Sequence, residues 1–131
     1  MKALIITDQA SMAFGTLQAL EEIFTELQVC NTVEVAKRLK PEFLPDLIVV
    51  TDQVSPVRPA ASVARDADVG ATPVILLTTG LSAVTNTDPS CSVRIEPPLT
   101  PIRARKALER LGLFALASQS PLPVSAGSQL S

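Results

Sequence analysis

The sequence of 131 residues predicts an α/β domain built on a doubly wound parallel sheet, with helices on both faces. Two observations support this fold class. Short aliphatic runs, apolar at every position, alternate along the chain with segments of helical periodicity. Strands that are apolar on both faces are typical of parallel sheets covered on either side by helices. Hydrophobic residues make up 47% of the chain and aromatic ones 3%, so the core must be aliphatic.

The apolar runs predict five strands, at residues 3–7, 27–30, 47–50, 74–77 and 93–95. The first helix is expected from Ala13, because apolar residues recur at helical spacing from there to Leu27. In the second helix, Asn31 followed three positions later by Glu34 resembles a capping box. Pro41 is expected to end that helix.

The second half of the chain predicts weaker helices. Residues 59–69 are rich in Ala but poor in large apolar side chains, which indicates a weak third helix. The interval from Thr78 to Glu96 is short and contains Gly and Pro, so a full fourth helix is not expected. Thr100 is expected to cap the last helix and Gly112 to end it. Residues 1–114 are predicted to form one domain, and residues 115–131 a disordered tail or linker.

Composition argues against several classes of function. The chain has no His, which excludes Ser-His and Cys-His nucleophilic catalysis within it. No strand is followed by a glycine-rich phosphate loop, so we expect no enzyme; a small flavodoxin-like enzyme or nucleotide binder is the alternative. The net charge of −2 argues against direct nucleic-acid binding. Because no apolar run is long enough for a signal peptide or a membrane span, a soluble cytoplasmic protein is expected.

Two further sets of side chains have both a structural and a functional reading. Cys30 and Cys91 lack the spacing of metal ligands and are expected to be free, small apolar residues. Arg103, Lys106 and Arg110 recur at helical spacing on one face of the last helix. A solvated face is the default interpretation of such a pattern, and a contact with a partner or with DNA is the alternative.

Two of the predicted strands end in an acid. Asp8 follows the first strand, and Asp52 follows the third in the stretch LIVVTDQVSP. Ligands of parallel α/β sheets bind at the carboxyl ends of the strands, so both acids are expected to face one crevice. The structural alternative is that each Asp caps the turn after its strand, a role that needs no ligand.

Five motifs in order resemble the receiver domains of bacterial response regulators, which are CheY-like, over the stretch from Lys2 to about Leu113. In chain order they are Thr7-Asp8-Gln9, Gly15 in the first helix, Asp52 with Pro56, Thr78 after the fourth strand, and Glu96-Pro97 after the fifth. The resemblance implies a flavodoxin-like fold with five strands in the order 2-1-3-4-5.

The resemblance also implies a chemistry for the crevice. Asp52 would accept a phosphoryl group, Asp8 and Asp52 would hold Mg²⁺, and Thr78 would contact the phosphate. Measured from Asp46, however, the acceptor position falls on Thr51, so two registers remain open.

Two departures from the family pattern indicate a degenerate receiver, or pseudo-receiver. Thr7 stands where the family has a second acid, so the Mg²⁺ site is weak or lost. Glu96 stands where the family has a lysine, and a carboxylate there would repel a phosphoryl group. A metal site of Asp8, Asp52 and Glu96 is the alternative interpretation. Because the family's Lys-Pro bond is typically cis, we expect a cis Glu96–Pro97 bond with the Glu96 carboxylate facing Asp52.

These features predict a domain that transduces signals through protein–protein contacts, without conventional Asp phosphorylation. The alternative is a conventional phospho-accepting receiver of a two-component phosphorelay, with Asp52 as acceptor, cut from a DNA-binding response regulator. The partners implied are a histidine kinase, a phosphotransfer protein, an output domain or a second copy of the chain.

Overall fold

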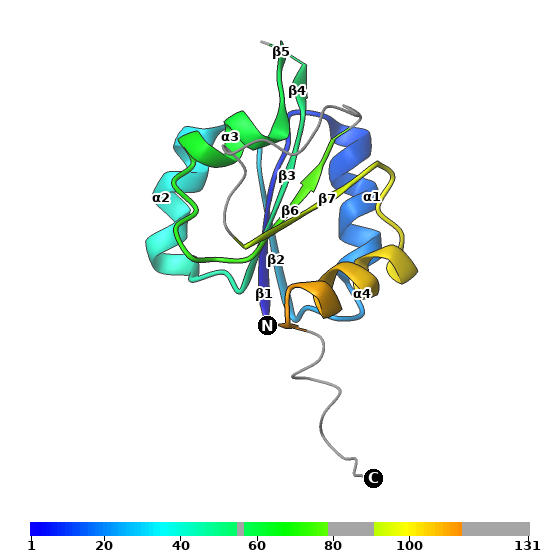
Figure 1. The fold of residues 1–131 in the computed structure, drawn as a ribbon. Helices are drawn as coiled ribbons and strands as arrows, with labels where there is room; N and C mark the ends of the chain where they lie inside the picture. The colour runs from blue at the N-terminus through cyan, green and yellow to red at the C-terminus, as the bar shows by residue number, and fades with distance from the viewer. Residues whose placement is uncertain (55–56, 79–90, 114–131) are drawn as a thin grey trace, which may run out of the picture.

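A five-stranded parallel sheet forms the centre of the computed structural model, which describes residues 1–54, 57–78 and 91–113. The sheet consists of β1 (Lys2–Ile6), β2 (Glu26–Cys30), β3 (Leu47–Thr51), β6 (Val74–Leu77) and β7 (Ser92–Ile95). Their order is β2-β1-β3-β6-β7, and every neighbouring pair is parallel (Figure 1). The predicted order 2-1-3-4-5 is therefore confirmed.

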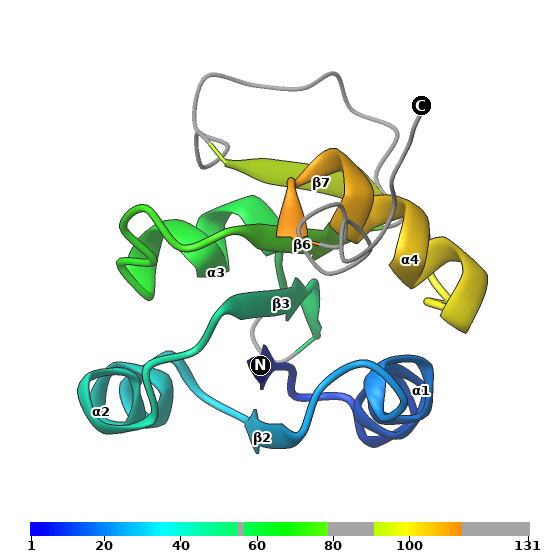
Figure 2. The same cartoon turned by 90° about the horizontal axis from the view of Figure 1, so that it is seen from below.

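Among the described residues, two helices cover each face of the sheet. Helices α1 (Ala10–Leu20) and α4 (Pro101–Arg110) lie on one side, and α2 (Val33–Phe43) and α3 (Ala60–Asp66) lie on the other (Figure 2). Successive strand residues alternate between the two layers: Ile48 packs in the cluster under α2 and α3, and Val49 in the cluster under α1 and α4. This burial on both faces explains why the strands are apolar at every position.

The first helix differs from its prediction at both ends. It begins at Ala10, three residues before the expected start, and Gln9 is its N-cap. The Ala13 N–H donates to the Gln9 carbonyl at 3.0 Å, so the turn from Gln9 is already helical. The helix ends at Leu20, and the apolar residues up to Leu27 belong to the connection and to β2.

The second helix corrects two predictions. Its N-cap is Thr32 rather than Asn31, because the Thr32 hydroxyl accepts the Val35 N–H at 3.2 Å. The helix also continues through Pro41 and ends at Phe43. Pro41 is exposed in the last turn and the preceding turn is exposed at Lys37, so water can satisfy the carbonyl that the missing N–H leaves free. Leu44 then ends the helix in a left-handed conformation (φ 53°) and donates its N–H to the Lys40 carbonyl.

Helices α3 and α4 match the predictions made for the third and the last helix. Helix α3 has seven residues, which agrees with the weak helix expected from its Ala-rich sequence. Helix α4 is capped by Thr100, whose hydroxyl accepts the Arg103 N–H at 3.3 Å, and Gly112 follows it with φ 82°. The expected loss of a helix before the fifth strand, the disordered tail and the boundary at residue 114 lie outside the described residues.

A two-stranded antiparallel hairpin lies beyond the carboxyl end of β3 and was not predicted. It pairs β4 (Gln53–Val54) with β5 (Val57–Arg58), and Figure 1 shows it projecting past the end of the sheet. Its apolar side chains face solvent: Val54 is 56% and Val57 86% exposed. No period-two pattern is visible in strands of two residues, so the sequence held no signal for this hairpin.

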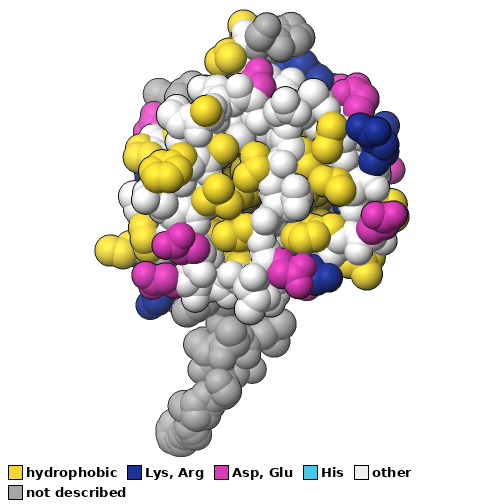
Figure 3. Space-filling model, turned by 180° about the vertical axis from the view of Figure 1, so that it is seen from behind, with side chains coloured by type: hydrophobic (Ala, Val, Ile, Leu, Met, Phe, Trp, Pro, Cys, Tyr) yellow, Lys and Arg dark blue, Asp and Glu magenta, His cyan; other side chains and the backbone are white. Residues whose placement is uncertain are grey.

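The edge strand β2 lies on the side of the molecule seen in Figure 3. Apolar side chains gather over the middle of this face, and acidic and basic ones lie mostly toward its rim. Of the five β2 residues only Cys30 is buried, whereas all five β3 residues are. Among the described helices none is long and apolar enough to cross a membrane.

Thiol reactivity tests the placement of the two edge strands. Cys30 is a buried, free cysteine on β2, and Cys91 is a free, partly exposed cysteine just before β7 at the opposite edge. Burial raises the pKa of the Cys30 thiol, which lowers its thiolate fraction. We expect an aromatic disulfide reagent to modify Cys91 rapidly and Cys30 slowly in the native protein, and both thiols in denaturant. A single modifiable thiol in denaturant, or equal native rates, would contradict this arrangement.

Candidate functional site

The site lies at the carboxyl ends of β1, β3 and β6. Ile6 pairs with Val50 and Thr51 with Leu77, so the residues that follow these strands emerge at the same edge of the sheet. Asp8, Asp52 and Thr78 are the residues that the sequence predicted for this edge. We call these three residues the carboxyl-edge site.

Asp52 is bonded within the fold through both of its carboxylate oxygens. Oδ1 accepts the main-chain N–H of Ala60 at 2.8 Å, and Oδ2 accepts the hydroxyl of Thr78 at 3.1 Å. Ala60 is the first residue of α3, whose N-cap position is occupied by Pro59, a residue with no side-chain acceptor. Asp52 therefore provides, from eight residues earlier in the chain, the acceptor that a helix N-terminus needs.

Thr51 is buried beside Thr7, which bears on the choice between the two predicted registers. Thr51 is fully buried, and its hydroxyl donates to Thr7 Oγ1 at 2.6 Å. Thr7 Oγ1 also accepts the N–H of Gln9 at 3.2 Å. Asp52, one residue later, is only partly buried. Of the two candidates, Asp52 is thus the one whose side chain reaches the surface.

Asp8 anchors the hairpin. Its two carboxylate oxygens accept the main-chain N–H of Val54 at 3.1 and 3.3 Å. A hollow of about 220 Å³ lies beside it, lined by Asp8, Asn31, Thr32, Val33, Glu34, Gln53 and Arg58. The Arg58 guanidinium in this hollow pairs with Asp66 and also donates to the Ser62 carbonyl at 3.3 Å. Sequence reasoning missed Val54 and Arg58, because only the hairpin brings them to this edge.

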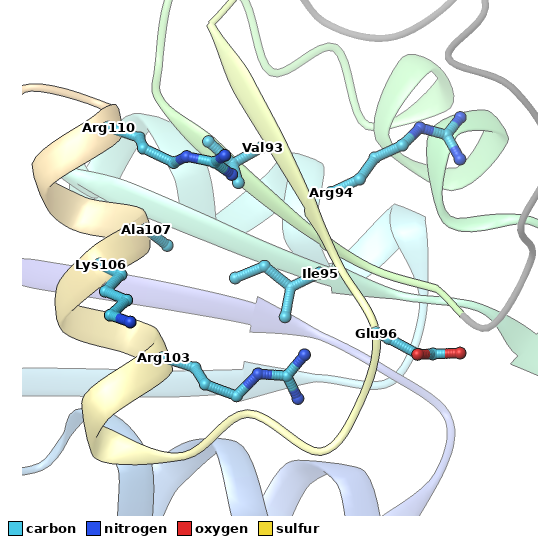
Figure 4. A pocket seen from close by; sticks show the side chains of 8 residues that line it. All are labelled: Val93, Arg94, Ile95, Glu96, Arg103, Lys106, Ala107 and Arg110. Carbon is cyan, nitrogen blue, oxygen red and sulfur yellow. The ribbon is translucent and has the colours of Figure 1, made fainter.

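Glu96 is not brought to the other two acids as expected. The cis bond is Pro97–Pro98, and Glu96–Pro97 is trans, so the prediction of a cis Glu96–Pro97 bond is wrong. Pairing of β7 with β6 ends at Ile95, whose carbonyl accepts the Thr78 N–H, and Glu96 beyond it is exposed. Its side chain points away from α4 (Figure 4). Within the described ranges, no group of three or more His, Cys, Asp or Glu side chains is placed to hold a metal ion.

The oxygens of the two remaining carboxylates already accept hydrogen bonds of the fold. Mg²⁺ requires near-octahedral oxygen ligands at about 2.1 Å. The Asp8 oxygens already face the Val54 N–H, and the Asp52 oxygens face the Ala60 N–H and the Thr78 hydroxyl. Thr7, which replaces the family's second acid, is buried in its own hydroxyl pair. A cation at this edge would have to share these oxygens with the hydrogen bonds that hold the hairpin and α3.

Several solved structures with a similar arrangement of elements are described as receiver domains or as parts of response regulators. The response regulator receiver domain (CheY-like) from Methylobacillus flagellatus gives a TM-score of 0.69 at 10% identity, over 85% of this chain and 98% of that one. The chain has the fold of response regulator receiver domains. The N-terminal domain of a response regulator/sensory box/GGDEF three-domain protein from Carboxydothermus hydrogenoformans gives 0.67 at 19% identity, over 90% and 99%.

A third similar structure is part of a larger regulator. The anti-anti-sigma factor PhyR from Bartonella quintana gives a TM-score of 0.65 at 23% identity, over 91% of this chain and 49% of PhyR. No family model matches the sequence, and neither does any curated protein. At such identities the likeness concerns the fold alone, so the function of the site has to be argued from its own residues.

Substitution of Asp52 tests its structural role. Asp52→Ala removes the acceptor of the Ala60 N–H and the Thr78 hydroxyl and should lower the free energy of unfolding by about 1–2 kcal/mol. Asp52→Asn retains one acceptor oxygen and should cost less. Urea denaturation measures both, with Glu42→Ala, at an exposed acid of α2, as control. If Asp52 were instead crowded by like charge, Asp52→Ala would stabilise the protein and refute the assignment.

Proposed function

We propose that this chain is a receiver-like signalling module that acts through contacts with other proteins and does not accept a phosphoryl group on Asp52. The observation that carries the proposal is the engagement of both Asp52 carboxylate oxygens, by the first N–H of α3 and by the Thr78 hydroxyl. An acid that caps a helix and joins it to β6 has a structural role without any ligand.

The charges around the crevice support the same conclusion. Phosphoryl transfer depends on cations that stabilise the developing negative charge. All eleven Lys and Arg residues lie in the described ranges. Among them, Arg58 forms an ion pair with Asp66. Thr7, which is neutral, stands where the family pattern has an acid that holds the metal ion. Glu96, which is anionic and exposed, stands where the family pattern has a lysine. Neither position therefore supplies the positive charge that phosphoryl chemistry needs, and Arg58, the cation that lines the hollow beside Asp8, is paired with Asp66.

The proposal assigns the chain no enzymatic activity and a cytoplasmic setting. Without an accepting Asp52, it favours an output domain or another signalling protein as partner over a histidine kinase or phosphotransfer protein. The solved domains with this fold include parts of multidomain regulators, which supports a role within a larger signalling assembly.

A conventional phospho-accepting receiver is the second candidate, and one observation favours it. The Thr78 hydroxyl lies 3.1 Å from Asp52 Oδ2, and Asp8 extends from the neighbouring strand β1. This is the relative placement that the family's phosphate contact and metal ligand require. In this alternative, the Ala60 N–H would exchange its carboxylate acceptor for a phosphoryl oxygen.

Intact mass after treatment with acetyl phosphate and Mg²⁺ separates the two candidates. We expect the wild-type mass to stay unchanged under conditions in which a conventional receiver domain, run in parallel, gains one phosphoryl group. The matched variant is Asp52→Asn, which should behave as the wild type does. A single phosphoryl addition to the wild type that disappears in Asp52→Asn would overturn the proposed function.

A further inference from the structure

The hollow beside Asp8, of about 220 Å³, lies between the hairpin and the start of α2. Its lining consists of Asp8, residues 31–34 at the start of α2, and Gln53 and Arg58 of the hairpin. Asp52 and Thr78 do not line it, so the hollow is separate from the position where the family pattern places a phosphoryl group. About seven water molecules occupy this volume in the liquid, so a small organic molecule has room in it.

The hairpin turns its two polar side chains toward this hollow. Gln53 pairs directly with Arg58, and Val54 with Val57. Residues directly opposite each other in an antiparallel pair share one face, and the next pair lies on the other face. Val54 and Val57 are exposed, whereas Gln53 is only 7% exposed and lines the hollow together with Arg58. One face of the hairpin is therefore solvated, and the other belongs to the hollow.

The side-chain amide of Gln53 is buried without a hydrogen-bond partner among residues 1–54, 57–78 and 91–113. Buried amides are normally hydrogen-bonded, because an amide without a partner costs free energy. A leucine, which has a similar size, would fill the same space without that cost. The packing of the hairpin thus gives no reason for a glutamine at this position, and a ligand in the hollow would give one.

The first turn of α2 supplies two further hydrogen-bond donors to the hollow. Thr32 accepts the Val35 N–H through its hydroxyl and the Ala36 N–H through its carbonyl, each at 3.2 Å. The N–H groups of Val33 and Glu34, which also line the hollow, have no acceptor within the described part of the chain. The start of this eleven-residue helix also carries partial positive charge, which favours an anionic group.

Arg58 completes the set of donors. Its Nη2 group pairs with Asp66 and donates to the Ser62 carbonyl at 3.3 Å. These contacts hold the guanidinium in place, and its Nη1 and Nε groups have no acceptor in the ranges that the structure describes. A guanidinium can donate five hydrogen bonds, so Arg58 can bind a ligand carboxylate while it remains paired with Asp66.

Two carboxylates, those of Asp8 and Glu34, line the same hollow and restrict the charge of its ligand. Because Asp66 already balances Arg58, a simple anion in the hollow would be repelled by both carboxylates. A simple cation would leave the helix N–H groups and the guanidinium without an acceptor. A molecule that carries both a carboxylate and an ammonium group adds no net charge and provides partners for both sets of groups.

We propose that the hollow binds a small zwitterion of the α-amino-acid class. Its carboxylate accepts hydrogen bonds from the first turn of α2 and from Arg58, and its ammonium group donates to Asp8 and Glu34. A short polar side chain of the ligand bonds to the Gln53 amide. The inference goes beyond the proposed function, because it gives the signalling module an input that requires no phosphorylation. A bound ligand would join the hairpin to α2.

NMR titration of the ¹⁵N-labelled protein with L-serine, L-asparagine and L-glutamine tests this inference. At least one of the three should shift the amide resonances of Val33 and Glu34 and the side-chain NH₂ resonances of Gln53, with a Kd of about 1 mM or tighter. For L-serine, two analogues separate the charges: serinol lacks the carboxylate, and L-glycerate has a hydroxyl in place of the ammonium group. Each should bind about tenfold more weakly than L-serine, or worse.

Two variants and a control assign the binding to the hollow. Gln53→Leu should weaken binding about tenfold and should keep or raise the melting temperature, because it removes a buried amide without a partner. Glu34→Gln removes one acceptor of the ammonium group and should weaken binding about threefold or more. Glu42→Gln makes the same charge change at an exposed position near the other end of α2 and should leave the Kd unchanged.

Four results would overturn the inference. They are no saturable shift of these resonances with any of the three amino acids, equal binding of L-serine and either analogue, stronger shifts with inorganic phosphate than with the amino acids, and unchanged binding in Gln53→Leu. None of them involves labelling of Asp52. Failure here therefore leaves the proposed absence of phosphorylation standing, and phosphorylation of Asp52 would not alter the titration with amino acids.

Discussion

The hydrogen bonds of Asp52 connect three parts of the chain at one edge of the sheet. The carboxylate joins the end of β3 to the start of α3 and to the residue after β6. The start of a helix exposes N–H groups that need acceptors, and a short helix with proline at its N-cap has few ways to satisfy them. Once held there, α3 can bury Ala60, Val63 and Ala64 against the sheet. The position of α3 thus depends on a strand-end acid.

Hydrogen bonds between neutral groups stabilise the same edge of the sheet. A cluster of acids at this edge would instead need a counterion. Three carboxylates brought together repel one another unless a cation or a proton intervenes. Here Thr7 takes one of these places, and its hydroxyl oxygen accepts both the Thr51 hydroxyl and the Gln9 N–H. Gln9 in turn donates its side-chain amide to the Asp52 carbonyl at 2.8 Å. The departure from the family pattern at Thr7 therefore removes a charge and adds a buried hydrogen-bond network that links β1 to β3.

Much of the fold could be predicted because it depends on local patterns. Aliphatic runs such as 47–50 identify buried parallel strands, and Thr100 and Gly112 mark the ends of α4 by residue type alone.

The features that sequence reasoning missed depend on distant contacts. The hairpin is held by Asp8 across 46 positions, and Asn31 and Thr32 are equally good cap residues by type. Glu96 was misjudged because the turn after β7 is made at Pro97–Pro98, one residue later than the family pattern implied. In the site, the sequence identified Asp8, Asp52 and Thr78, but their hydrogen-bond partners became visible only in three dimensions.

Hydrogen exchange at the amide of Ala60 tests most directly whether Asp52 is committed to the fold. In the wild type, NMR should find this amide protected, and Mg²⁺ at millimolar concentration should leave its exchange rate unchanged. In Asp52→Ala its exchange should accelerate at least tenfold more than that of the β3 amides, which report any loss of global stability. An Ala60 amide that is unprotected in the wild type, or that becomes unprotected when Mg²⁺ is added, would show that the Asp52 carboxylate is available for metal and phosphoryl chemistry and would contradict this account.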